Sequence, residues 1–72
     1  MTSVMHLTLS ELLDLELRMR GTSLNRWCAS HGMTDTMLVE MLQGTRREVP
    51  EIRLALEEEL GCDIRKLMER IV

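Results

Sequence analysis

The sequence has almost no aromatic residues: Trp27 stands alone, and there is no Phe or Tyr. It also has one proline, Pro50, and two cysteines, Cys28 and Cys62. Two cysteines are too few for the disulfide framework of a small secreted domain, so we expect free thiols in a reducing, cytoplasmic setting. With so few aromatics, leucine and the seven methionines must fill the interior, and methionine packs adaptably.

Long apolar runs are missing as well. No stretch approaches the roughly 18 apolar residues of a membrane span, so we expect no membrane partner. The first residues, MTSVMHLTL, have no basic start and no long apolar stretch, which argues against a signal peptide. Seventy-two residues fit one domain with a thin core, which an all-helical arrangement or a homodimer would close economically.

Helix signals begin at Thr8. Thr8 and Glu11 have the spacing of a capping box, which predicts a first helix over residues 9–20. The alternation of apolar and charged residues between Leu13 and Met19 would also fit a strand. Leu, Glu, Arg and Met are helix formers and are neither β-branched nor aromatic, so the helix is favoured.

Capping residues divide the rest of the chain into four further helices. These are expected to begin after Thr22 or Ser23, after Thr34, at Pro50 and after Asp63. Glycines that favour a left-handed conformation are expected to end the first four helices, at Gly21, Gly32, Gly44 and Gly61. The sequence therefore predicts an all-α, compact five-helix domain over residues 8–72, preceded by a flexible N-terminal arm over residues 1–7.

The stretch from Leu24 to Gly44 predicts two short helices joined by a tight turn at Gly32. Two helices that meet across a turn of about three or four residues form the helix-turn-helix motif. In that motif the second helix enters the major groove of DNA. The central stretch therefore favours a small DNA-binding protein.

The charge distribution supports this interpretation. Residues 18–47 carry five arginines against Asp35 and Glu40, for +3, whereas residues 1–17 and 48–72 each carry −3. A positive segment that coincides with the helix-turn-helix suits a DNA-binding face on an otherwise acidic domain.

The spacing in this stretch resembles the helix-turn-helix of the lambda-repressor and Cro-like superfamily. That pattern has a small residue early in the second helix, here Cys28, then glycine four residues later, here Gly32, and an apolar residue next, here Met33. It also has aliphatic positions in the third helix, here Leu38 and Met41. This sequence departs from the family in three ways. Ala is usual where Cys28 stands, an apolar residue is usual where His31 stands, and the third helix carries two acids and no base.

Two further stretches, RGTSL (Arg20–Leu24) and ALEEELG (Ala55–Gly61), look most like small phage regulators of the Ner type. The resemblance implies a five-helix lambda-repressor-like domain that binds double-stranded operator DNA. The implied function is a sequence-specific transcriptional regulator of the phage or prophage repressor type, acting as a homodimer.

The residues expected to read bases share the outer side of the third helix. Gln43 can bond adenine, Glu40 can accept from cytosine, and the Thr36 and Val39 methyls can touch thymine. The full base-reading set is Thr34, Asp35, Thr36, Val39, Glu40 and Gln43. The alternative is that these residues form a solvated helix face.

Phosphate contacts are expected from basic residues around the motif, Arg20, Arg26, Arg46 and Arg47. Their alternative roles are surface solubility or pairing with the many glutamates. A dimer interface is expected from apolar residues in excess of a monomer core: Leu12, Leu15, Met19, Leu67, Met68 and Ile71.

Other functions have weaker signals. The acids of the third helix suggest an alternative, a helix-turn-helix fold that binds a protein partner as an antirepressor or adaptor. Cys28, His31, His6 and Cys62 lack the paired close spacings of a structural zinc site, so we expect no metal or other cofactor. We also expect no enzymatic activity, because a chain this small offers no evident substrate pocket.

Overall fold

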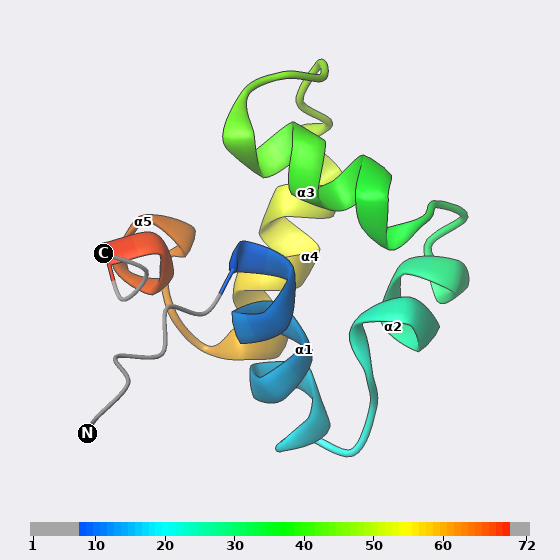
Figure 1. Ribbon diagram of the computed structural model, residues 1–72, viewed down its shortest axis with the longest axis vertical. Helices are drawn as coiled ribbons and strands as arrows, with labels where there is room; N and C mark the ends of the chain where they lie inside the picture. The colour runs from blue at the N-terminus through cyan, green and yellow to red at the C-terminus, as the bar shows by residue number, and fades with distance from the viewer. Residues whose placement is uncertain (1–7, 70–72) are drawn as a thin grey trace, which may run out of the picture.

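The structure, a computed structural model, describes residues 8–69, and this range forms five α-helices and no strand. In chain order they are α1 (Leu9–Arg18), α2 (Leu24–Ser30), α3 (Asp35–Gln43), α4 (Pro50–Leu60) and α5 (Ile64–Met68). The predicted all-α, five-helix class is confirmed over this range. Helix α1 contacts α2, α3 and α4, and α2 contacts α3 (Figure 1). The predicted arm, residues 1–7, lies outside the described residues.

The predicted capping box at the start of α1 is present. The Thr8 hydroxyl accepts from the Glu11 N–H at 3.2 Å, and the Glu11 carboxylate accepts from the Thr8 N–H at 2.9 Å. The helix ends at Arg18, two residues earlier than the predicted end at residue 20. The chain then turns through Gly21, which has φ +85°, and the Thr22 N–H bonds the Leu17 carbonyl at 3.1 Å. This glycine-terminated turn satisfies carbonyls at the end of the helix.

The other helices also begin where their capping residues predict. The Ser23 hydroxyl, of the two candidates, accepts from the Arg26 N–H at 3.2 Å. The Thr34 hydroxyl caps α3, and the Asp63 carboxylate caps α5. Pro50 occupies the first turn of α4, where its missing N–H leaves no intrahelical bond unmade.

The turn between α2 and α3 comprises residues 31–34. Gly32 has φ +74°, a left-handed conformation that costs a residue with a Cβ about 1–2 kcal/mol. The following Met33 N–H bonds the Cys28 carbonyl at 3.0 Å, which closes the end of α2. The predicted role of Gly32 in the turn is confirmed.

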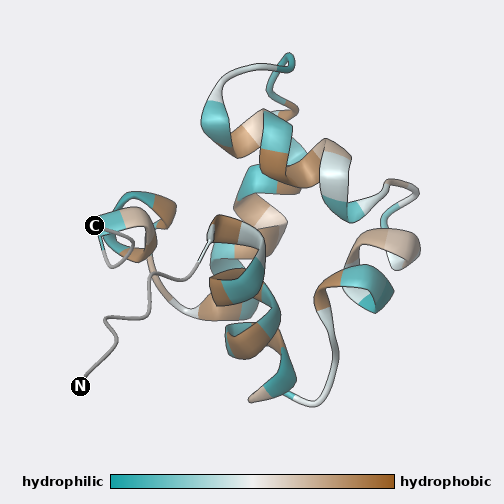
Figure 2. Ribbon diagram, viewed as in Figure 1, coloured by the Kyte–Doolittle hydropathy of each residue, from teal (hydrophilic) through white to brown (hydrophobic). Residues whose placement is uncertain are grey.

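Leucine supplies most of the buried core residues. Each helix carries both apolar and polar residues (Figure 2), and most of the apolar ones pack against one another. The buried residues are Leu9, Leu12, Leu13, Leu17, Leu24, Trp27, Cys28, Leu38, Met41, Leu56, Leu60, Ile64 and Leu67. Leu12 and Leu67 were predicted to face a second copy, but the domain's own core takes them up, so that prediction is wrong for these two residues.

Trp27 anchors the contact between α2 and the rest of the core. Its side chain is buried, and the His31 ring stacks on it at a centroid distance of 3.9 Å. The His31 Nδ1 lies 2.9 Å from the Trp27 carbonyl oxygen. The ring therefore covers the end of α2 next to the turn.

Polar contacts between helices complete the fold. The Arg20 guanidinium donates to the Leu60 carbonyl at 2.7 Å, which joins the end of α1 to the end of α4. The Glu57 carboxylate accepts from the Ile64 N–H at 3.1 Å and so holds the start of α5. Among the helices of residues 8–69, none has the length and hydropathy needed to cross a membrane.

Candidate nucleic-acid interface

The outer side of α3 is open to solvent. Thr34, Thr36 and Gln43 are exposed, and the other three predicted base-reading residues are partly exposed. Five of the six line a hollow of about 300 Å³ between α3 and the start of α1, closed on the α1 side by Ser10. We call this the α1–α3 hollow; its α3 residues are Asp35, Thr36, Val39, Glu40 and Gln43. The structure thus places five of the six predicted residues along this hollow, and the sixth, Thr34, caps the start of α3.

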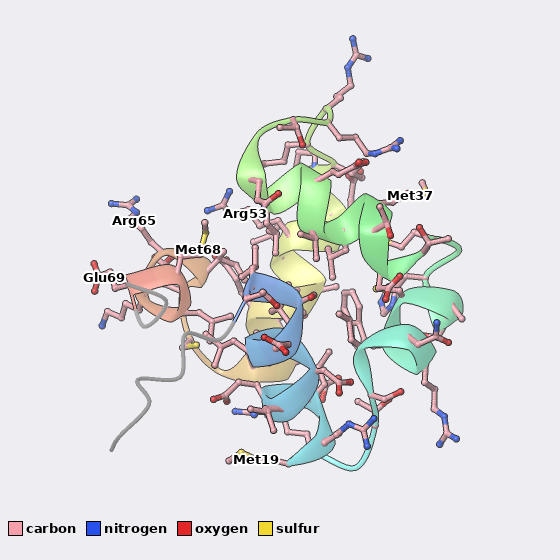
Figure 3. All side chains as sticks on the ribbon, viewed as in Figure 1. Met19, Met37, Arg53, Arg65, Met68 and Glu69 are labelled. Atoms are coloured by element: carbon pink, nitrogen blue, oxygen red, sulfur yellow. The ribbon has the colours of Figure 1, made fainter. Side chains whose placement is uncertain are left out.

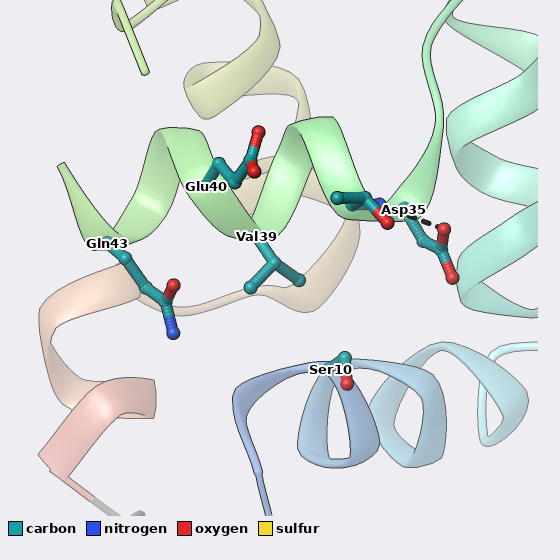
Figure 4. Close-up of a pocket in the computed structure, with 6 residues that line it drawn as sticks. Ser10, Asp35, Val39, Glu40 and Gln43 are labelled. Carbon is teal, nitrogen blue, oxygen red and sulfur yellow. Dashed lines mark hydrogen bonds between the residues drawn. The ribbon is translucent and has the colours of Figure 1, made fainter. Parts of the chain in front are cut away.

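The members of this set differ in how far they can reach. Val39 and Gln43 extend from α3 toward the side on which Ser10 lies (Figure 4). Val39 also packs against the core, so only part of it is available to a partner. Gln43, at the last turn of α3, is exposed and is the freer of the two.

Carboxylates surround the start of α3. A second hollow of about 280 Å³ lies next to the first and shares Ser10 and Asp35 with it. Glu11 and Asp14 of α1 also line it. Three carboxylates therefore lie near the first turn of α3. Asp14 is paired with Arg18, whereas Glu11 and Asp35 would repel phosphate. A DNA backbone is better accommodated at the opposite end of α3, toward the loop of residues 44–49.

That loop carries Arg46, which pairs with α3 itself. The Arg46 Nε and Nη2 atoms lie 3.1 and 3.0 Å from the Glu40 Oε1 atom. The pair is partly exposed on both sides. Arg46 therefore pairs with a glutamate, as the alternative prediction for the basic residues stated. Its positive charge offsets the negative charge of Glu40, one of the two acids on α3.

Arg20 was also predicted to contact phosphate, but its guanidinium is already bonded to other residues of the domain. Besides the Leu60 carbonyl, its guanidinium bonds the Glu16 carbonyl at 2.8 Å and the Glu16 carboxylate at 3.2 Å. Arg20 is therefore paired with a glutamate, which is one of the alternative roles considered for these basic residues. Arg20 thus has a structural role in joining α1 to α4.

Arg26 and Arg47 differ from the other two. Both side chains are exposed, and neither guanidinium makes an ion pair or hydrogen bond with any residue between 8 and 69. Arg26 lies on α2 and Arg47 follows α3, so they come from opposite sides of the turn at Gly32. Of the four predicted phosphate contacts, these two have their full donor capacity free.

The remaining apolar candidates do not form one patch. Leu15 on α1 is 48% exposed, and Met19, the residue that follows α1, is 76% exposed. Met68 is only partly exposed, and Figure 3 places it on α5, well away from Met19. Ile71 lies outside the described residues. Within residues 8–69, the exposed members of the predicted dimer interface are therefore Leu15 and Met19.

Sequence reasoning missed other features. Leu54 on α4 is 61% exposed and was not named as a candidate, although its helical phase, two residues from the buried Leu56, places it on the other side of the helix. The sequence placed Glu11 and Asp14 on the first helix but did not predict that they lie near Asp35. That proximity arises from the packing of α1 against α3, which spacing along the chain does not reveal.

The cysteines are free thiols. Cys28 is buried, and burial, with the nearby Asp35 carboxylate as a smaller cause, raises its pKa to about 11. Since the thiolate is the nucleophile and the metal ligand, Cys28 is inert near neutral pH. No three His, Cys, Asp or Glu side chains within residues 8–69 are grouped to hold a metal ion; His6 lies outside this range.

Comparisons with protein-family models, with curated proteins and with solved structures found no significant match. The chain's own residues must therefore carry any proposal of function. The features that bear on it are the α2–turn–α3 unit, the open side of α3, and Arg26 and Arg47, which have no partner among residues 8–69.

Proposed function

We propose that the protein is a small, sequence-specific DNA-binding transcriptional regulator of the phage or prophage repressor type, with a lambda-repressor-like fold. The observation that supports it most is the α2–turn–α3 unit. The two helices are joined by four residues around a left-handed Gly32, and the outer side of α3 is uncovered. Two short helices in this relation can place the second one in a major groove.

In this proposal α3 reads bases mainly through its exposed polar residues. Thr36 and Gln43 have the freedom to reach base edges, and Gln43 suits adenine. Arg26 and Arg47 bind phosphates on either side of α3. The backbone approaches from the Arg47 end, because the Asp35 end carries three carboxylates.

The operator-bound form is proposed to be a homodimer that pairs through α1. Leu15 and Met19 supply the exposed apolar surface. A two-fold dimer would bind two half-sites about one turn of DNA apart.

A salt titration tests the proposal. Duplexes are selected from a random library by the wild-type protein, and affinity for the enriched sequence is measured by fluorescence anisotropy at several salt concentrations. We expect an enriched sequence and a linear fall of log affinity with log salt. Replacing Arg26 and Arg47 with alanine should lower the slope by about two, because each arginine that binds a phosphate adds roughly one to it.

The control is Arg65→Ala, which removes one positive charge from α5. Arg65 is exposed and lies far from α3 (Figure 3), so its removal should change the slope little. No enriched sequence, together with negligible affinity at low salt, would reject the DNA-binding function.

One observation favours a second function. The residues that line the two hollows beside α3 include four carboxylates, Glu11, Asp14, Asp35 and Glu40, and no base. Such a surface complements a basic protein segment better than DNA. The protein would then act as an antirepressor or adaptor. Binding to a lysine- and arginine-rich peptide that is abolished in Asp35→Asn, with no DNA enrichment, would support it.

A further inference from the structure

The acid at the centre of the proposed reading surface is bound to an arginine. Glu40 lies on the outer side of α3, and its Oε1 atom accepts from both Nε and Nη2 of Arg46. Both side chains are partly exposed, and exposed ion pairs contribute little to the free energy of unfolding. The main effect of this ion pair is therefore to hold the Arg46 guanidinium beside α3.

The backbone between the two residues is fixed as well. Gly44 turns the chain with φ +85°. The Thr45 N–H and hydroxyl then both donate to the Glu40 carbonyl, at 2.9 and 3.1 Å. Glu40 thus holds the loop with its carbonyl and Arg46 with its carboxylate. Arg47, the next residue, has no such contact and serves as an internal comparison.

The contact leaves part of the guanidinium free. An arginine has five N–H donors in a planar fork. Nε–H and one Nη2–H point to Glu40, so both Nη1 hydrogens and the second Nη2–H remain for a ligand. Two parallel N–H donors suit paired acceptors, either two phosphate oxygens or the O6 and N7 atoms of guanine.

We propose that Glu40 is a positioning residue for Arg46, and that the pair presents the free end of the Arg46 fork to paired acceptor atoms of DNA. This inference rests on the proposed DNA-binding function. It assigns Glu40 a role different from that of a base reader. It also accounts for an acid on α3, because the carboxylate is used to orient a base before the complex forms.

The proposal predicts opposite effects of Glu40→Gln on two kinds of duplex. Loss of the carboxylate frees Arg46, so affinity for the selected duplex should fall about fivefold. The same change removes a negative charge near phosphate, so affinity for a scrambled duplex should stay equal or rise. The ratio of the affinity for the selected duplex to the affinity for the scrambled duplex should therefore fall.

A double-mutant cycle provides the test. Wild type, Glu40→Gln, Arg46→Ala and the double variant are measured against both duplexes, with Arg47→Ala and Glu58→Gln as controls. We expect Glu40→Gln to weaken selective binding in the wild-type background and to cause no loss in the Arg46→Ala background. Arg47→Ala combined with Glu40→Gln should be additive. Unchanged helical content and melting temperature establish that each variant folds.

Single base-pair changes in the selected duplex identify the acceptor. If Arg46→Ala removes discrimination at one guanine, the fork reads a base; if it weakens all duplexes alike and lowers the salt slope by about one, it binds phosphate. Either result agrees with positioning when the cycle shows coupling.

Other outcomes overturn the inference. An equal loss from Glu40→Gln in both backgrounds would mean that Glu40 contacts DNA independently of Arg46. An equal gain in both would mean that Glu40 only repels phosphate. In either case the wild type still selects a duplex, so the DNA-binding function stands while the positioning role fails. If the wild type selects no duplex, the proposed function itself fails.

Discussion

Asp14 on α1 accepts a hydrogen bond from the backbone N–H of Leu24, the first residue of α2, at 2.9 Å. The other carboxylate oxygen of Asp14 pairs with the Arg18 Nε at 2.6 Å. The Asp14 side chain therefore accepts from an otherwise unpaired N–H at the start of α2 and joins that end of α2 to α1. This hydrogen bond links a side chain of α1 directly to the first residue of α2.

The first prediction concerns Asp14. Asp14→Ala should lower the melting temperature more than Asp14→Asn, because an asparagine oxygen can still accept from the Leu24 N–H. Glu58→Gln, at an exposed residue of α4, is the control and should change the melting temperature little. Equal stability of wild type and Asp14→Ala would contradict this role.

The pH dependence of stability follows from the same contact. The Leu24 N–H first, and Arg18 second, hold the pKa of Asp14 below its usual value of 3.8. A carboxyl whose pKa is lower in the folded state stabilises the protein above the unfolded pKa, and this contribution is lost as pH falls through the folded pKa. The stability gap between wild type and Asp14→Asn should therefore close below about pH 4. A gap that persists unchanged to pH 2 would refute it.

The second prediction uses the two sides of α1. Leu17 is fully buried, so Leu17→Ala should cost about 3 kcal/mol of unfolding free energy, enough to unfold much of so small a domain. Leu15 is 48% exposed, and Leu15→Ala should cost about 0.5 kcal/mol or less. Urea unfolding measures both. Similar losses of unfolding free energy for the two variants would mean that α1 does not bury Leu17 and expose Leu15 as described.

The third prediction concerns the turn. Gly32→Ala should destabilise the protein by about 1 kcal/mol, because alanine pays a steric cost at φ +74°. Gly32→Asn should lose less, since asparagine tolerates the left-handed region better. Denaturant unfolding compares the three proteins. An alanine variant as stable as wild type would show that Gly32 does not adopt this conformation.

The fourth prediction distinguishes the cysteines. A thiol with a pKa of about 11 is ionised to roughly one part in a thousand at pH 8, so Cys28 should resist alkylation in the folded protein. Cys62 is only partly buried and should react. Mass spectrometry after a short iodoacetamide treatment should find one modification, and two in denaturant. Modification of Cys28 at the same rate as Cys62 would contradict its burial.

The fifth prediction concerns self-association. If copies pair through α1, Leu15→Glu with Met19→Glu should convert a dimer to a monomer in sedimentation experiments. Leu54→Glu, at an exposed leucine on α4, should leave the dimer intact. A wild type that stays monomeric at high concentration, or a double variant that still dimerises, would rule out this interface.

Local signals in the sequence predicted the helices well. The hydroxyls of Thr8, Ser23 and Thr34 cap nearby N–H groups, and such bonds span only three residues. Gly32 and Gly44 were likewise recognisable, because a positive φ is a property of one residue. Hydrogen bonds between residues only three apart depend on residue type and spacing, so they could be predicted from the sequence.

Contacts between helices could not be read in this way. Leu12 and Leu15 share one strip of α1 in a periodicity argument, yet Leu12 is buried and Leu15 is half exposed. Which of the two faces the core depends on how α1 lies against its neighbours. The same holds for Arg20, whose bond to the Leu60 carbonyl joins residues 40 positions apart.

The most direct measurement is a backbone NMR titration of the ¹⁵N-labelled protein with the selected duplex. The proposal predicts that the largest amide shifts fall on α3, from Thr36 to Gln43, and on the loop as far as Arg47, with little change on α4 and α5. It would be contradicted by shifts concentrated on α4 or α5, or by no shifts at a saturating concentration of DNA.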